Sequence, residues 1–132
     1  MEDRVTSKIL IIGDDAQTQI DLIQAFADQA FRAYVTPKGR SVSFQLSLVQ
    51  PDLIVLDTPY SKSDRWRVLR QIRALSFVPV IALIAPDQVE IKVEGLESGA
   101  DFSMAKPVSA DELQARARAL LRRAQYVAHH AA

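Results

Sequence analysis

Four charged residues stand where apolar runs end, and their types suggest ionic chemistry. They are Asp57 after the run 53–56, Asp14 and Asp15 shortly after the run 9–12, and Lys106 after the weaker segment 102–105. A charge directly after a buried strand lies where the strand emerges at a sheet edge, half sheltered and open to a ligand. Carboxylates together with an amine at such an edge would hold a cation and an anionic group at the same time.

The elements that must position these residues can be predicted from apolar patterning. Strands are expected at 8–12, 32–36, 53–56, 80–85 and 102–105, and the first, third and fourth are near-continuous Ile, Val and Leu. Such runs are typical of central parallel strands covered on both faces. Segments with helical spacing lie between and after the strands. The sequence therefore predicts an α/β fold, a five-stranded doubly wound parallel sheet with five helices and right-handed crossovers.

Each predicted helix has an apolar face, and two of them carry end signals. The expected faces are Ile20, Ile23, Phe26 and Ala30; Val42, Leu46 and Val49; Trp66, Leu69 and Ile72; Val89, Val93, Leu96 and Ala100; and Leu113, Ala117, Leu120, Ala124 and Val127. Ser109 with Glu112 predicts a capping box, and Gly99 suits a helix C-terminus. Doubly wound sheets bind ligands at the carboxyl ends of their strands. We therefore expect Asp14, Asp57 and Lys106 to share one pocket.

Length and composition exclude several classes of function. The 132 residues suit one domain, expected over 1–125, with 126–132 as a C-terminal tail or the start of a linker. The net charge of zero gives no basis for direct nucleic-acid binding, and the absence of cysteine excludes thiolate chemistry. No signal peptide or membrane span is predicted, so a cytoplasmic location is the default. His129 and His130 alone do not define a metal site.

Two groups of arginines are expected to be solvated helix faces. They are Arg65, Arg67, Arg70 and Arg73 in the third helix, and Arg116, Arg118, Arg122 and Arg123 in the last. The alternative for the last helix is a face for dimerisation or for an effector domain. Trp66 is predicted to lie in the core.

The order and separation of several segments resemble the receiver domain of bacterial two-component response regulators. These segments are 8–15, 51–57, 79–85 and 95–101, followed by Lys106 and Pro107. The stretch 120–124 resembles the end of receivers that precede winged-helix DNA-binding domains. The resemblance implies the flavodoxin-like receiver fold, with strand order 2-1-3-4-5, and a role in a phosphorelay.

The resemblance also implies roles for individual residues. Asp57 would accept a phosphoryl group from a histidine kinase, and Lys106, aimed by a cis bond to Pro107, would contact the phosphoryl oxygens. Asp14, Asp57 and the backbone carbonyl of Pro59 would hold Mg²⁺, which offsets the repulsion between carboxylate and phosphate. A downstream effector domain or a second copy, through the fourth helix, fifth strand and fifth helix, would receive the signal.

The sequence departs from the receiver pattern at three positions. Gly13 replaces the first of two neighbouring acids, although Asp15 would compensate if the loop shifted by one residue. Ile84 replaces the hydroxyl residue that ends strand four, and Ser103 replaces the switch aromatic. These substitutions predict a degenerate receiver that keeps the acceptor and lacks the conventional switch.

Other classes of function remain as alternatives. One is a pseudo-receiver that acts as a phosphorylation-independent interaction or dimerisation module. A flavin or dinucleotide enzyme would need a Gly-rich loop, and a dehalogenase-type phosphatase would need an acid at Pro59. We expect no enzymatic activity beyond Mg²⁺-dependent autophosphorylation of Asp57 from a phosphodonor.

Overall fold

The central element is a parallel sheet of five strands, β1 (Ser7–Ile12), β2 (Phe31–Val35), β3 (Leu53–Asp57), β4 (Val80–Ile84) and β5 (Phe102–Ala105). The computed structural model describes residues 6–36, 40–58 and 65–130. The strand order is β2-β1-β3-β4-β5, and every pairing is parallel. The predicted fold class, strand order and strand positions are confirmed to within about one residue at each end.

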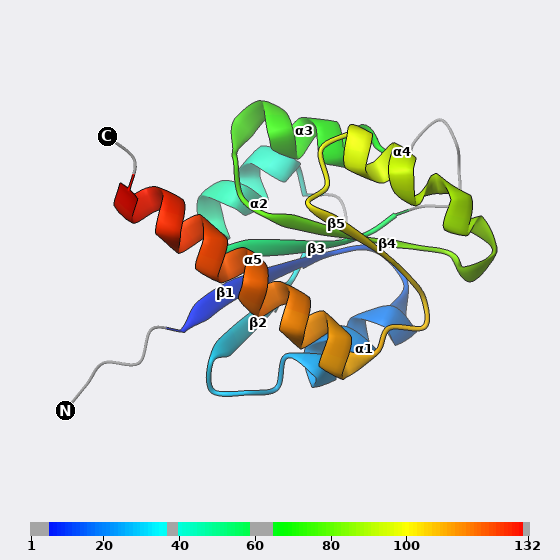
Figure 1. Ribbon diagram of the computed structural model, residues 1–132, viewed down its shortest axis with the longest axis horizontal. Helices are drawn as coiled ribbons and strands as arrows, with labels where there is room; N and C mark the ends of the chain where they lie inside the picture. The colour runs from blue at the N-terminus through cyan, green and yellow to red at the C-terminus, as the bar shows by residue number, and fades with distance from the viewer. Residues whose placement is uncertain (1–5, 37–39, 59–64, 131–132) are drawn as a thin grey trace.

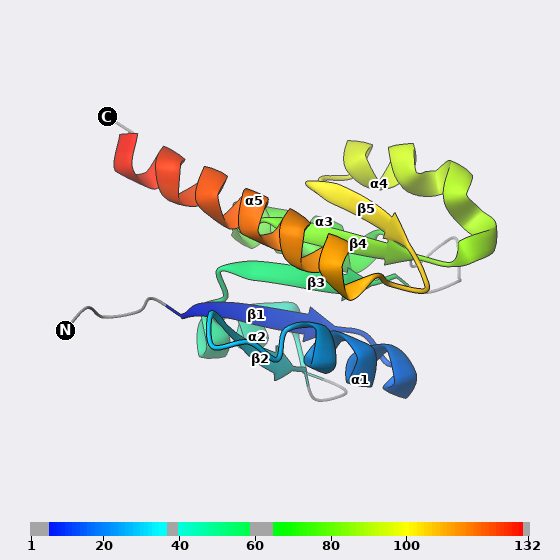
Figure 2. The same cartoon turned by 60° about the horizontal axis from the view of Figure 1, so that its bottom comes forward.

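Helices cover both faces of this sheet. They are α1 (Ala16–Ala25), α2 (Val42–Val49), α3 (Arg67–Leu75), a 3₁₀ segment η1 (Pro86–Ile91), α4 (Lys92–Glu97) and α5 (Ala110–His130). Helices α1 and α5 lie on one face, and α2, α3 and α4 lie on the other (Figures 1 and 2). None of the helices in the described part of the chain has the length and apolar character needed to span a bilayer.

The strands divide their side chains between two separate cores, as the period of two requires. Ile9, Ile11 and Val55 point into the core under α1 and α5. Leu10 and Leu56 point into the core under α2, α3 and α4, which also contains Trp66, Leu69 and Ile72. This alternation explains why the central strands are apolar at every position.

Two predicted helix faces are wrong in part, since only Phe26 and Ala30 of one and Ala100 of the other are buried or pack on the core as predicted. In α1 the buried residues are Thr18, Leu22 and Ala25, whereas Ile20 and Ile23 are exposed. The segment carries apolar residues on two sides, and the sheet buries the side that contains Leu22 and the following Phe26. The predicted faces of α2 and α3 are confirmed, because Val42, Leu46 and Val49 pack beside the buried residues of α3.

The predicted fourth helix is two short pieces, η1 and α4, rather than one. Its expected apolar residues Val93 and Leu96 are exposed, and Gly95 is buried instead. The helix is rotated because the ring of Trp66 packs directly against Gly95. Gly99 has a positive φ of 117°, as expected for the residue that ends this helix.

Helix α5 begins as predicted and ends later than predicted. The backbone N–H of Glu112 donates to the Ser109 hydroxyl at 3.3 Å, which is the Ser109 half of the predicted capping box. Leu113, Ala117 and Leu121 are buried, whereas the predicted Val127 is exposed. The helix continues through 126–130, the residues expected to form a tail or linker. The domain boundary at residue 125 stays a prediction.

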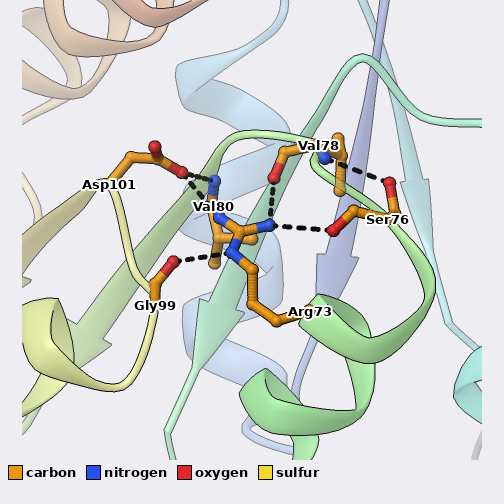
Figure 3. Close-up of polar contacts among 6 residues, drawn as sticks. All are labelled: Arg73, Ser76, Val78, Val80, Gly99 and Asp101. Atoms are coloured by element: carbon orange, nitrogen blue, oxygen red, sulfur yellow. Dashed lines mark hydrogen bonds and ion pairs between the residues drawn. The ribbon is translucent and has the colours of Figure 1, made fainter.

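Arg73 ties α3 to the amino-terminal edge of the sheet (Figure 3). Its guanidinium donates to the carbonyls of Gly99 at 2.8 Å and Val78 at 2.5 Å, and forms an ion pair with Asp101 at 2.7 Å. Asp101 also accepts from the backbone N–H of Val80 at 2.8 Å. The prediction of a fully solvated arginine face is therefore wrong for Arg73.

Arg65 is a second exception, because it lies in the turn before α3 and is buried. Arg67 and Arg70 are exposed as predicted. A guanidinium that reaches backbone carbonyls stabilises helix ends and turns, which spacing on a helix does not reveal.

Candidate functional site

Three strand ends bring the predicted site residues to one edge of the sheet. Asp57 is the last residue of β3, Asp14 and Asp15 follow β1, and Lys106 follows β5. The backbone N–H of Lys106 donates to the carbonyl of Ile84 at 2.8 Å, which fixes the end of β5 to the end of β4. The peptide bond between Lys106 and Pro107 is cis, as the resemblance implied.

Asp57 and Lys106 form an ion pair, with 2.9 Å between the Lys106 Nζ and an Oδ of Asp57. The two side chains come from strands that are not neighbours, since β4 lies between them. Asp57 is only 7% exposed and Lys106 is 22% exposed. The pair is therefore a sheltered carboxylate with a cation at its open side.

The environment of Asp57 disfavours its ionised form. Burial raises the pKa of the Asp57 carboxyl above its ordinary value, and the Lys106 ammonium lowers it by a smaller amount. The negative charges of Asp15 and Asp14 raise the pKa of Asp57 further. Three carboxylates therefore act on one another at this edge, and their repulsion would be relieved by a cation.

Asp14 and Asp15 have different roles in the loop after β1. Asp15 is the N-cap of α1, and it accepts from the backbone N–H of Thr18 at 2.9 Å and from the Thr18 hydroxyl at 2.5 Å. These two bonds lower the pKa of Asp15. Asp14 is exposed. The cap is thus formed by Asp15, and Asp14 is left as the better candidate for a metal ligand.

Gly13 contributes a contact that the sequence analysis missed. A Cβ atom built on Gly13 would lie 2.7 Å from the Cβ of Asp57, so the loop touches the acceptor side chain directly. The side-chain amide of Gln19 donates to the Gly13 carbonyl at 2.6 Å and fixes the loop there. A glycine at a strand end is a signal for such a close backbone approach.

The two substituted switch positions are both buried. Ile84 is in the core under α3 and α4, and Ser103 lies on the same face of the sheet, where its hydroxyl donates to the Lys92 carbonyl at 3.4 Å. The neighbouring Phe102 packs on the opposite face, under α5, as alternation predicted. Near Asp57, the hydroxyl of Thr58 donates to the Leu83 carbonyl at 2.7 Å. Pro59 lies outside the described residues.

The site suits a divalent cation that is held weakly by few protein ligands, rather than one enclosed by many. Within residues 6–36, 40–58 and 65–130, no group of three or more acidic, histidine or cysteine side chains is arranged to hold a metal ion. Asp15 is engaged as a cap, which leaves Asp14, together with Asp57 beside Lys106, as the carboxylates that can take a cation. Mg²⁺ prefers one or two carboxylates and keeps several waters, so this donor set suits it.

Comparison with known proteins identifies the family. The response regulator receiver domain matches residues 9–118. The chain belongs to the response regulator receiver family. It is a receiver domain of two-component systems, and the resemblance read from the sequence is confirmed. Receiver domains are not enzymes in the usual sense; they work with histidine kinases and effector domains, and the family generally depends on Mg²⁺.

Curated relatives and solved structures agree with this assignment. The chain is 39% identical to the transcriptional regulatory protein PcoR of Escherichia coli, over 89% of this chain and 53% of that protein. It is 37% identical to the transcriptional activator IrlR of Burkholderia pseudomallei, over 89% of this chain and 52% of that protein. The chain thus spans about half the length of these relatives.

Among solved structures, the receiver domain of a Francisella response regulator matches with a TM-score of 0.76 and 32% identity, over 90% of this chain and 99% of that one. The receiver domain of the response regulator TorR matches with a TM-score of 0.77 and 29% identity, over 89% and 98%. The similarity therefore covers whole receiver domains.

Proposed function

We propose that this receiver accepts a phosphoryl group on Asp57, with Lys106 contacting the phosphoryl oxygens. The observation that supports it is the 2.9 Å ion pair between these residues at the open edge of the sheet. An Oδ of Asp57 would attack phosphorus, the bond from phosphorus to the donor would break, and the donor would leave with the bonding electrons. Lys106 would stay beside the new anion as a mobile point charge.

The proposed cofactor is Mg²⁺, held by Asp14, Asp57 and the backbone carbonyl of Pro59, with Asp15 as a secondary candidate. The cation would offset the repulsion between the Asp57 carboxylate and the incoming phosphoryl group. Burial is the main cause of the raised pKa of Asp57, but the charges of Asp15 and Asp14 add to it, and this repulsion between carboxylates supports the assignment. Gly13 supplies no carboxylate, so we expect weak binding.

The proposed donor is a histidine kinase, and the proposed receiver of the signal is an effector domain or partner protein. Transfer from a kinase that uses ATP would take place in the cytoplasm. The domain itself would bind neither nucleic acid nor membrane. This chain matches about half the length of the transcriptional regulators PcoR and IrlR, which supports a transcriptional effector domain as the receiver of the signal.

A homodimer through α4, β5 and α5 is part of the proposal. Helix α4 exposes Val93 and Leu96 beside Glu94 and Glu97, and Glu90 of η1 is exposed as well. On the side of α5 next to β5, Arg116 and Arg123 line a pocket with Phe102. Arg118 lies on the other side of α5, where it pairs with Asp28 at 3.5 Å. Opposite charges on adjacent elements make the face complementary to a second copy of itself.

A phosphorylation-independent interaction module is the second candidate. It is favoured by Ile84 and Ser103, which lack the chemistry of the conventional switch. The retained pair of Asp57 and Lys106 supports phosphoryl transfer instead, because a scaffold would not need a buried carboxylate with a raised pKa.

Mass spectrometry after incubation with acetyl phosphate and Mg²⁺ distinguishes the two candidates. We expect a single phosphoryl adduct on Asp57 that is absent without Mg²⁺ and absent in Asp57→Asn. Labelling that persists in Asp57→Asn would contradict the assignment of the acceptor. A complete lack of labelling, with an acceptor-competent receiver as a positive control, would favour the interaction module.

A further inference from the structure

Trp66 is the only tryptophan of the chain, and it stands at the junction between the acceptor side of the domain and α4. It precedes the first residue of α3 and is 4% exposed. A tryptophan buried to this extent normally bonds its indole N–H within the protein. The contacts of this ring therefore show what it holds in place.

The outer end of the ring contacts α4. The indole N–H of Trp66 donates to a carboxylate oxygen of Glu94 at 2.5 Å. A Cβ built on Gly95 would lie 2.7 Å from Cη2 of Trp66 and 2.8 Å from the hydroxyl of Ser103. The ring thus occupies the space that a side chain at position 95 would take. A large aromatic from α3, a glycine in α4 and a small residue in β5 fit together at one point.

Trp66 also belongs to the buried cluster on the α3 side of β3 and β4. Trp66 is in the same buried cluster as Leu56, which precedes Asp57, and Ile84, which ends β4. The residue after Asp57 is fixed to β4 as well, because the backbone N–H of Thr58 donates to the Leu83 carbonyl at 3.0 Å. Close-packed cores transmit displacement rather than absorb it.

Helix α4 is suited to respond to such a displacement. It has six residues, and it follows a 3₁₀ segment whose helical geometry is interrupted at Gln88. Its apolar residues Val93 and Leu96 are exposed, so its burial depends on Gly95 and the ring beneath it. A short element with few buried groups shifts at low energetic cost.

We propose that Trp66 couples the state of Asp57 to the position of α4. The inference rests on the proposed function, since it assumes that Asp57 is phosphorylated. A phosphoryl group on Asp57 makes the partner of Lys106 larger and more negative. The ends of β3 and β4 adjust, the ring moves with Leu56 and Ile84, and α4 follows because Glu94 and Gly95 are in direct contact with the ring. Trp66 is a positioning residue in this scheme and not a catalytic one.

The test uses ¹H–¹⁵N NMR of the protein before and after phosphorylation with acetyl phosphate and Mg²⁺. Two signals are followed, the indole N–H of Trp66 and the backbone amide of Gly95. We expect both to shift in the wild type and neither to shift in Asp57→Asn. In Trp66→Phe, which keeps an aromatic ring and removes the donor, Asp57 should still be phosphorylated, and the Gly95 shift should fall by more than half.

A second pair of variants tests the coupling independently, in case Trp66→Phe does not fold. Glu94→Ala removes the acceptor of the indole N–H, whereas Glu97→Ala removes a similarly exposed acid about one turn further along α4. We expect the Gly95 shift to be reduced in Glu94→Ala and unchanged in Glu97→Ala.

Equal Gly95 shifts in the wild type, Trp66→Phe and Glu94→Ala would overturn the coupling role while leaving Asp57 as the acceptor. So would a Gly95 shift with a stationary indole signal. Failure of Asp57 to be labelled in the wild type, seen by mass spectrometry of the same samples, would instead overturn the proposed function, and the coupling role with it.

Discussion

At the scale of single residues, the site combines a buried carboxylate with a nearby cation and two further acids. Burial raises the pKa of Asp57, and Lys106 only partly offsets that cost. Groups held in an unfavourable ionisation state are typical of functional sites, since a purely structural residue would be selected for a stable one. The cost of burying Asp57 can be measured as a change in the free energy of unfolding when the residue is replaced.

Asp57→Asn should stabilise the unphosphorylated domain at neutral pH, or leave its stability unchanged. Because the folded-state pKa of Asp57 is raised, the folded protein binds more protons than the unfolded chain between the two pKa values. Its free energy of unfolding therefore falls as pH rises through that window, and the deficit persists above it. Asparagine has no such term, so its advantage should be full above the folded-state pKa of Asp57, should shrink as pH falls through the window between the two pKa values, and should be absent below the ordinary carboxyl pKa.

Urea unfolding of both proteins from pH 3 to pH 8 measures this difference. Lys106 loses its partner in Asp57→Asn, but it is partly exposed and can be hydrated. A variant less stable than the wild type at pH 7, with a deficit that grows with pH, would mean that the ion pair outweighs the cost of burial.

Gly13→Ala should destabilise the domain by about 1–3 kcal/mol, the usual cost of inserting a methyl group into a filled space. The new Cβ would lie 2.7 Å from the Cβ of Asp57, so the loop or the acceptor must move. Asp14→Ala, in the same loop but exposed, should change the stability by less than about 0.5 kcal/mol. Equal unfolding midpoints for the two variants would show that the loop has room beside Asp57.

At the scale of elements, the two ends of the parallel strands differ in the contacts that they make. The carboxyl edge carries the chemistry, whereas the amino-terminal edge is joined by the guanidinium of Arg73, which links α3, the start of β4 and the segment after α4. These contacts fix the carboxyl-terminal end of α3 (Figure 3), so in the proposed coupling a displacement at the carboxyl edge of the sheet would act at the other end of α3, beside Trp66.

Arg73→Ala should lower the free energy of unfolding by about 2–3 kcal/mol, from the loss of hydrogen bonds made by a charged group and the carbonyls left unsatisfied. The matched control is Arg70→Ala, one turn away on the same helix and exposed, for which we expect less than about 0.5 kcal/mol. Urea denaturation of both variants measures the difference. Similar losses in the two would indicate that helix propensity, and not the bonding of Arg73, sets the effect.

The sequence allowed the strands to be predicted better than the helix faces. Continuous apolar runs fixed the central strands, and the positions of Asp57 and Lys106 at strand ends followed from them. The predicted faces of α1 and α4 were wrong in part because Ile20 and Val93 are apolar but exposed. What decides the α4 face is the contact between Trp66 and Gly95, a pairing of residues far apart in the chain that no local period records.

At the scale of the whole molecule, charge is balanced but not evenly distributed. The net charge is zero, yet α5 carries the exposed Arg116 and Arg123 beside β5, and α4, which also contacts β5, carries the exposed Glu94 and Glu97. Separated charges of this kind contribute little to folding and more to the choice and orientation of a partner. The exposed apolar residues Val93 and Leu96 of α4 would supply the apolar contact area with that partner.

Leu96→Glu should therefore weaken self-association of the phosphorylated protein by at least about tenfold in dimer Kd, which corresponds to about 1.4 kcal/mol for one buried contact. Ile20→Glu is the matched control, because Ile20 is 48% exposed, as Leu96 is, and lies on α1 across the sheet. Sedimentation velocity at low and high salt measures both, and the wild-type dimer should weaken with salt because its charges are solvent-exposed. If Ile20→Glu dissociates the dimer while Leu96→Glu does not, the interface lies on the α1 face instead, and the charges of α4 and α5 serve another partner.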